Sequence, residues 1–226
     1  MIALLGDSVF DNETYVKSKE KAVDSVVRNL GYDCKLYAVD GAVISDVYSQ
    51  IDKVKKELKP NDTIFLSIGG NNALGTLSLV HNNIHLSVDK LLLLLNDFLL
   101  EFEEELDSLY SHMSGTFRKV PICITNIYYP SFDFQDRNLF FHSLKEKGHH
   151  QKILKLVDSI NTIIQRKAKE YTFRLVDINS AFHSKIFYAN EIEPSFEGSK
   201  LLANLIENIL KVRQSSTLSL QFNEEK

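Results

Sequence analysis

The sequence has few of the residues that mark several large classes of protein. Its 226 residues include two cysteines, four prolines, nine glycines and no tryptophan. This composition excludes a disulfide scaffold, a collagen-like repeat and a low-complexity disordered chain. Cys34 and Cys123 lie far apart and lack metal-ligand spacing. We therefore expect two reduced, buried thiols.

Positive charge is not in excess either. The chain has 26 Lys and Arg against 30 Asp and Glu, which gives a formal net charge of −4 at pH 7. A protein that binds nucleic acid electrostatically needs a basic face, so we expect no nucleic-acid partner. The charged share of 25% and hydrophobic share of 44% are average for a globular protein, and the length suits one domain.

The sequence also has no long apolar run, and we expect no export leader. The most apolar stretch, residues 91–100, is interrupted by Asn96 and Asp97 and is far short of the roughly 20 residues of a membrane span. No basic segment or cleavage site precedes Gly6. We expect a cytoplasmic protein without an integral membrane segment. Non-classical export through a C-terminal signal is the alternative, and the oligomeric state is open.

Short apolar runs alternate with helix-like periodic segments along the chain. Strands are predicted at residues 2–5, 34–39, 63–68, 120–126 and 173–178, and helices at 13–30, 44–58, 86–112, 153–171 and 198–212. This alternation is typical of a parallel sheet with helices on both faces. It predicts a single α/β domain over residues 1–213.

Two segments do not fit that pattern. Residues near 130–150 are rich in aromatics without a clear period, so we predict an irregular insertion, which either forms an apolar wall for an ester or simply packs on the domain. Residues 214–226 form a polar tail in which three apolar residues alternate. A short edge strand and disorder both remain open for this tail.

Small or polar residues follow the predicted strands, and in an open α/β sheet the site lies outside the carboxyl ends of the strands. These residues are Gly6-Asp7-Ser8, Asp40-Gly41-Ala42, Gly69-Gly70-Asn71-Asn72 and the segment 190–195. Ser8 can act as a nucleophile, while Gly41 and Asn71 can donate N–H groups to a developing oxyanion. Taken singly, each also fits a helix cap or a turn.

In this order, the blocks resemble the SGNH (GDSL-like) hydrolase family from residue 6 to about residue 203. The resemblance implies a three-layer α/β/α flavodoxin-like sandwich with a five-stranded parallel sheet. It also implies hydrolysis of a small-molecule ester through an acyl-serine intermediate. Ser8 would be the nucleophile, and Ser8, Gly41 and Asn71 would form the oxyanion hole. The sequence contains no metal cluster or nucleotide motif, so we expect no cofactor and no metal.

The last block departs from the family pattern of Asp-x-x-His. Asn190 stands at the aspartate position and Glu193 at the histidine position. In one interpretation Glu193 is the base, its pKa raised by burial from about 4.3 towards 6–7, with the amide of Asn190 donating to it. In a second, another histidine enters the site, and His183 is the best placed. In a third, the protein is catalytically impaired and acts as a ligand-binding or interaction module.

Overall fold

The computed structural model describes residues 1–82, 87–134 and 140–224 and contains a five-stranded parallel sheet. The order is β2-β1-β3-β4-β5. The strands are β1 (Ile2–Gly6), β2 (Cys34–Leu36), β3 (Thr63–Ser67), β4 (Ile122–Thr125) and β5 (Arg174–Val176). All residues of β1, β3 and β4 are buried, as expected of central parallel strands covered on both faces. All five predicted strands are confirmed.

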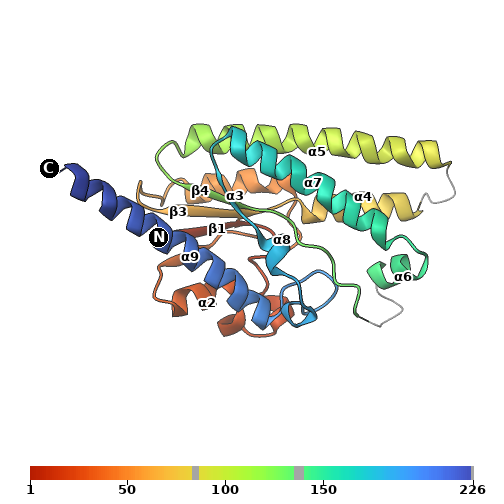
Figure 1. Ribbon diagram of the computed structural model, residues 1–226, viewed down its shortest axis with the longest axis horizontal. Helices are drawn as coiled ribbons and strands as arrows, with labels where there is room; N and C mark the ends of the chain where they lie inside the picture. The colour runs from red at the N-terminus through yellow and green to blue at the C-terminus, as the bar shows by residue number, and fades with distance from the viewer. Residues whose placement is uncertain (83–86, 135–139, 225–226) are drawn as a thin grey trace.

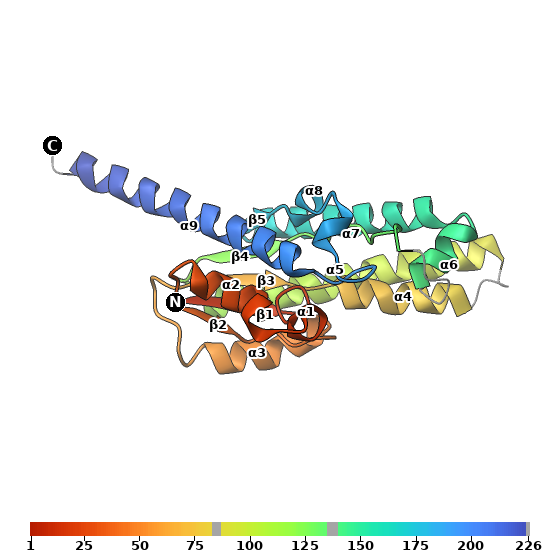
Figure 2. The same cartoon turned by 90° about the horizontal axis from the view of Figure 1, so that it is seen from below.

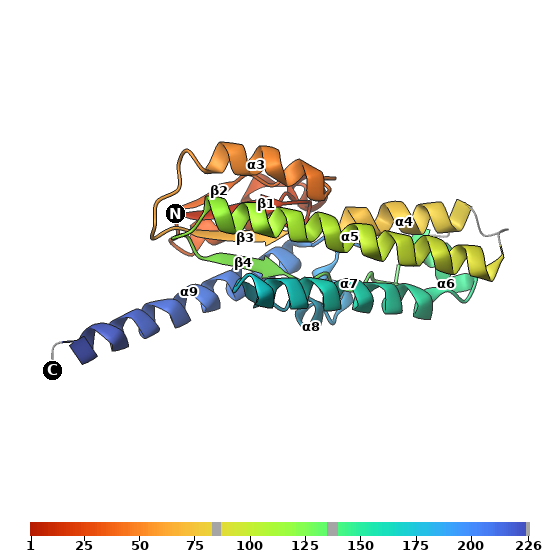
Figure 3. The same cartoon turned by 90° about the horizontal axis from the view of Figure 1, so that it is seen from above.

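Helices cover both faces of the sheet (Figures 1 and 3). On one face, α3 (Val47–Val54), α5 (Val88–Thr116) and α7 (His150–Glu170) share a core with Ala3, Leu5, Ile64 and Leu66. On the other face, α2 (Val23–Asn29) and α9 (Phe196–Glu224) share a core with Ile2, Leu4 and Phe65. Because alternate strand residues point to opposite faces, the two cores are separate. The predicted three-layer α/β/α sandwich is confirmed.

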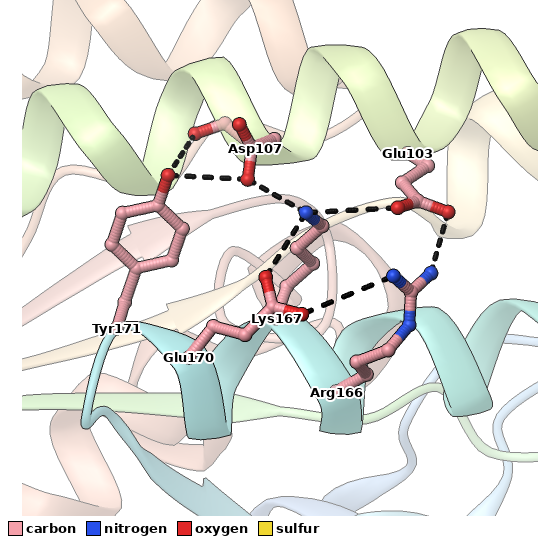
Figure 4. A network of polar contacts seen from close by, with 6 residues as sticks. All are labelled: Glu103, Asp107, Arg166, Lys167, Glu170 and Tyr171. Atoms are coloured by element: carbon pink, nitrogen blue, oxygen red, sulfur yellow. Dashed lines mark hydrogen bonds and ion pairs between the residues drawn. The ribbon is translucent and has the colours of Figure 1, made fainter.

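A polar network joins α5 to α7 on the outer side of the first core (Figure 4). The ammonium of Lys167 lies 2.8 Å from Asp107 and 3.6 Å from Glu103, and Arg166 lies 2.5 Å from Glu103. The hydroxyl of Tyr171 also donates to Asp107 over 3.1 Å. These contacts fix the register of two long helices whose apolar sides cover the sheet.

The prediction of one helix over residues 13–30 is wrong, because this segment forms three short elements. They are α1 (Glu13–Val16), a 3₁₀ turn η1 (Lys19–Lys21) and α2. Lys17 adopts φ 54° and ends α1 in the left-handed region. The buried side chain of Asn12 then accepts the N–H of Val23 at 3.0 Å and donates to Ser199 at 2.8 Å. This tertiary contact overrides the local helical period.

Helices also occur where none was predicted. The helix α4 (Gly70–Asn82) begins directly after β3, and α6 (Phe140–Glu146) forms within the aromatic segment near 130–150, of which residues 135–139 lie outside the described part of the chain. Both helices lie towards the carboxyl ends of the strands (Figure 1). The remaining short elements are η2 (Ile44–Asp46), α8 (Ile178–Ala181) and η3 (Lys185–Phe187).

The C-terminal helix α9 runs from Phe196 to Glu224 and projects beyond the sheet (Figures 1 and 2). Most of the tail predicted over 214–226 is therefore helical, and the edge-strand interpretation is wrong. Cys34 and Cys123 are both buried and form no disulfide. Across the described residues, no helix combines the length and apolarity needed to cross a bilayer.

Candidate active site

The turn after β1 presents Ser8 at the carboxyl edge of the sheet. Gly6 pairs with Ser67 of β3 and has φ 116°, and a Cβ at this position would lie 1.7 Å from the Ser67 carbonyl oxygen. Only glycine fits such an approach. Gln50 of α3 clamps the same residue, because its side chain accepts the Gly6 N–H at 2.7 Å and donates to the Gly6 carbonyl at 2.9 Å.

The hydroxyl of Ser8 donates to Oε1 of Glu193 at 3.2 Å. Both side chains are buried, with residue exposures of 8% and 6%. Burial raises the pKa of Glu193 to about 7, and the charges of Asp40 and Asp7 add to this effect while the Ser8 hydrogen bond opposes it. A carboxyl group with this pKa exchanges a proton readily near neutral pH. The fold thus brings together two residues that lie 185 positions apart in the sequence.

The loop that carries Glu193 is held through its main chain. The side-chain oxygen of Asn190 accepts the N–H groups of Ile192 and Glu193, each at 2.9 Å. The hydroxyl of Tyr128 donates to the Ile192 carbonyl at 2.6 Å. We predicted that the Asn190 amide donates to the Glu193 carboxylate, but the contact runs the other way, from main-chain N–H to side-chain oxygen. Asn190 therefore shapes the turn.

Asn71 lies in the first turn of α4 and lines the same cavity as Ser8. Its amide donates to the Ala42 carbonyl at 2.9 Å, which links the loops after β2 and β3 and leaves a second N–H of the amide. Gly41 precedes Ala42 with φ 80° and is exposed. Gly41 is absent from the described residues that line the cavity, so the structure brings Ser8, Asn71 and Glu193 together and places Gly41 beside them.

His183 is not brought to Ser8. It is exposed after α8, and its ring packs edge-on against Phe187 with centroids 5.6 Å apart. Among the described residues that line the cavity, His183 does not occur. Glu193, and not His183, is thus the residue that the Ser8 hydroxyl contacts.

Ser8 and Glu193 open into a cavity of about 650 Å³, including its open mouth. Its polar lining residues include Asp7, Ser67, Asn71 and Asn126. Its apolar lining residues include Leu74, Leu77, Pro130, Phe141, Ile153, Val157 and Ile192. The cavity therefore suits a ligand that has both a polar and an apolar part.

Asp7 is a cavity residue whose role sequence reasoning missed. Its Oδ1 accepts the hydroxyl of Ser67 at 3.1 Å and the N–H of Val9 at 3.2 Å. Burial raises the pKa of Asp7 to about 7, against the effect of these hydrogen bonds. Leu74 and Leu77 were missed as well. Leu74 lies three residues after Asn71, and Leu77 three residues after Leu74. This spacing was the available signal, since residues three apart are neighbours on a helix surface.

The fold and this arrangement define an α/β protein with a serine–glutamate pair in a cavity at the carboxyl edge of its sheet. The sequence matches the GDSL-like lipase/acylhydrolase family over residues 2–206. The chain belongs to this family, which supports ester hydrolysis and a small-molecule substrate in general terms. Among curated proteins, no sequence matches the chain.

Solved structures show the same fold at low identity. An extracellular lipase from Streptomyces rimosus has 18% identity and a TM-score of 0.65, covering 92% of this chain and 98% of that one. A phospholipase A1 from Streptomyces albidoflavus has 20% identity and a TM-score of 0.64, with the same coverage. A lipase/acylhydrolase from Enterococcus faecalis has 17% identity and a TM-score of 0.58, covering 94% of this chain and 95% of that one.

Proposed function

We propose that this protein hydrolyses carboxylic esters with Ser8 as nucleophile and Glu193 as general base in place of the usual histidine. The observation that carries the proposal is the hydrogen bond from the Ser8 hydroxyl to Glu193 at 3.2 Å. Burial supports it, because a pKa of about 7 makes this carboxylate a far better proton acceptor than an ordinary glutamate.

The proposed reaction has two steps. Ser8 Oγ bonds to the ester carbonyl carbon as its proton passes to Glu193, and the alcohol then leaves with that proton. Water next attacks the acyl-serine, again giving a proton to Glu193, which returns it to Ser8 as the carboxylic acid product departs. The second N–H of Asn71 and the main-chain N–H groups of Ser8 and Gly41 would stabilise the oxyanion in both steps.

The apolar part of the cavity supports an ester with an apolar acyl group. Leu74 and Leu77 of α4 line the cavity and pack against Phe141 of α6 and Ile153 of α7. Burial of a hydrocarbon chain there contributes about 0.8 kcal/mol per methylene. A carboxylesterase acting on such esters is the activity that we propose.

A binding module is the second candidate. The raised pKa of Glu193 means that about half of the molecules carry a neutral carboxyl at pH 7, and a neutral carboxyl cannot accept the serine proton. A protein with this cavity and little turnover would still bind an acyl ligand. This alternative predicts binding that does not depend on Ser8.

The test is hydrolysis of p-nitrophenyl butyrate by the wild type and by Ser8→Ala and Glu193→Gln variants. We expect Ser8→Ala to lower kcat by at least about a thousandfold and to abolish labelling by a fluorophosphonate. Ser159, whose hydroxyl donates to the Lys155 carbonyl of its own helix, provides the matched Ser→Ala control. Equal rates in the wild type and Ser8→Ala would refute the proposal.

A further inference from the structure

The apolar wall of the cavity is a hydrophobic cluster distinct from the two cores beside the sheet. Its buried members are Phe141 and Leu144 of α6 and Ile153 of α7, and Leu74 and Leu77 of α4 pack against them. Figures 1 and 3 show α4, α6 and one end of α7 gathered at the same end of the molecule. From Asn71 to Leu77 the wall extends about 9 Å along the axis of α4, at roughly 1.5 Å per residue.

Glu191 is a buried carboxyl group that the proposed hydrolysis does not use. It is 5% exposed, and its Oε2 accepts the main-chain N–H of Phe141 at 3.0 Å. Its own main-chain carbonyl accepts the N–H of Ser131 at 2.7 Å. Burying a carboxyl group is unfavourable unless it is hydrogen-bonded. The hydrogen bond from the Phe141 N–H helps to offset the cost of burying Glu191.

The same loop carries the base. Glu191, Ile192 and Glu193 are consecutive, Ile192 lines the cavity, and Glu193 accepts the Ser8 hydroxyl. Asn190 and Tyr128 hold this loop in place. Because the Phe141 N–H donates to Glu191, a displacement of Glu191 would move Phe141 relative to Ser8. The aromatic wall and the reacting serine are thus positioned by one short segment.

We propose that Glu191 is a positioning residue that fixes Phe141 in the acyl wall and makes the site selective for medium-chain acyl groups. The inference rests on the proposed function. A long wall held in place favours an octanoyl group over an acetyl group, because only the longer chain reaches Phe141 and Leu77. A palmitoyl chain exceeds the roughly 9 Å of wall provided by α4.

The test compares p-nitrophenyl acetate, butyrate, octanoate and palmitate. We expect the wild type to prefer octanoate. In Glu191→Ala, kcat/KM for octanoate falls about tenfold through KM while acetate changes by less than about twofold, because the variant loses the acceptor of the Phe141 N–H. Glu191→Gln keeps an oxygen acceptor and retains the preference. Glu101→Ala, on the exposed side of α5, is the control.

Two measurements separate this inference from a general loss of structure. The pH midpoint of hydrolysis should be the same in Glu191→Ala as in the wild type, because Glu193 remains the base. If Glu191→Ala does not fold, Phe141→Leu replaces it and should lower selectivity for octanoate over acetate. A loss that is equal for all four esters, or no loss at all, would overturn the role of Glu191.

Ligand binding distinguishes failure of the inference from failure of the proposed function. Octanoic acid is titrated against a fluorescent fatty acid bound to the Ser8→Ala protein, with and without Glu191→Ala. Binding about tenfold weaker in the double variant supports the wall even if the wild type hydrolyses no ester. Ser8-dependent hydrolysis together with unchanged octanoate binding keeps the function and refutes the inference.

Discussion

Oε1 of Glu193 accepts the Ser8 hydroxyl at 3.2 Å, while Oε2 of the same carboxyl is buried and has no hydrogen-bond partner among the described residues. A carboxylate held in this way is poorly stabilised in its charged form. The raised pKa of Glu193 follows mainly from this burial. The same feature that makes the group a stronger base also keeps it partly protonated at neutral pH.

The rate of ester hydrolysis should therefore rise with pH through a midpoint near 7, the pKa of Glu193. Below this pH the carboxyl is neutral and cannot accept the serine proton, and above it the rate levels off. The check is a pH profile of kcat/KM for p-nitrophenyl butyrate. In Glu193→Gln the remaining slow rate should lose this midpoint. A wild-type midpoint near 4.5, the ordinary value for glutamate, would contradict the prediction.

Asn190→Asp should shift that midpoint upwards. The side-chain oxygen at this position can still accept the N–H groups of Ile192 and Glu193, so the turn is preserved. The new carboxylate lies near Glu193, and a like charge disfavours ionisation. We expect the midpoint to rise by about one pH unit. The pH profile measures this rise, and Asn190→Ser, which keeps an oxygen without charge, is the control. An unchanged midpoint in Asn190→Asp would contradict the prediction.

Asn71→Ala should lower kcat by about a hundredfold, the usual effect of removing one oxyanion donor. The loss of the bond to the Ala42 carbonyl should cost only about 1 kcal/mol of stability. The neighbouring Asn72 lies on the same turn, and its oxygen accepts the Ile44 N–H at 3.2 Å. Asn72→Ala is thus the matched control, with a similar stability loss and a much smaller effect on kcat. Equal kcat losses in both variants would mean that Asn71 acts only through structure.

Much of the fold could be predicted from sequence because β1, β3 and β4 are continuous apolar runs. Ser8 and Asn71 follow such strands, so the carboxyl edge of the sheet brings them together. The break at Lys17 could not be predicted, because it depends on Asn12 reaching Val23 and a distant serine. Local periodicity contains no information about such a contact.

The helix α4 escaped prediction for a different reason. It starts with Gly70, Asn71 and Asn72, residue types of low helix propensity, so packing against α5 stabilises it instead. The direction of the Asn190 contact and the bond from Phe141 to Glu191 also depend on how a loop folds in space. Residue types at a spacing indicate proximity, but they do not indicate which atom donates.

The contribution of Glu193 and Asp7 to stability should decrease as pH rises from about 4 to 7. The pKa values of Glu193 and Asp7 are near 7 in the folded protein, against 4.5 and 3.8 ordinarily. At pH values between the ordinary and the raised pKa, the folded state binds more protons than the unfolded state. The free energy of unfolding therefore falls as pH rises through this range, and the contribution of these two groups is constant well above pH 7. Each group contributes at most about 3–4 kcal/mol.

Urea denaturation of the wild type, Glu193→Gln and Asp7→Asn at pH 5 and pH 8 measures this effect. We expect each variant to show a smaller difference between the two pH values than the wild type, because each removes one group that must ionise while buried. The amide oxygen of Asp7→Asn still accepts from Val9 and Ser67. A pH difference identical in all three proteins would contradict the raised pKa values.

Gly6→Ala should prevent folding, whereas Gly41→Ala should not. Both glycines have positive φ, 116° and 80°, so alanine is strained at either position by about 1–2 kcal/mol. At Gly6 the added Cβ also meets the Ser67 carbonyl oxygen at 1.7 Å, while at Gly41 nothing lies within 4 Å. Thermal unfolding monitored by circular dichroism distinguishes the two. Since the Gly41 N–H survives the change to alanine, Gly41→Ala should also keep most of the hydrolytic activity. An unfolded Gly41→Ala protein would contradict the prediction. It would show that the loop after β2 is packed more tightly than its exposure indicates.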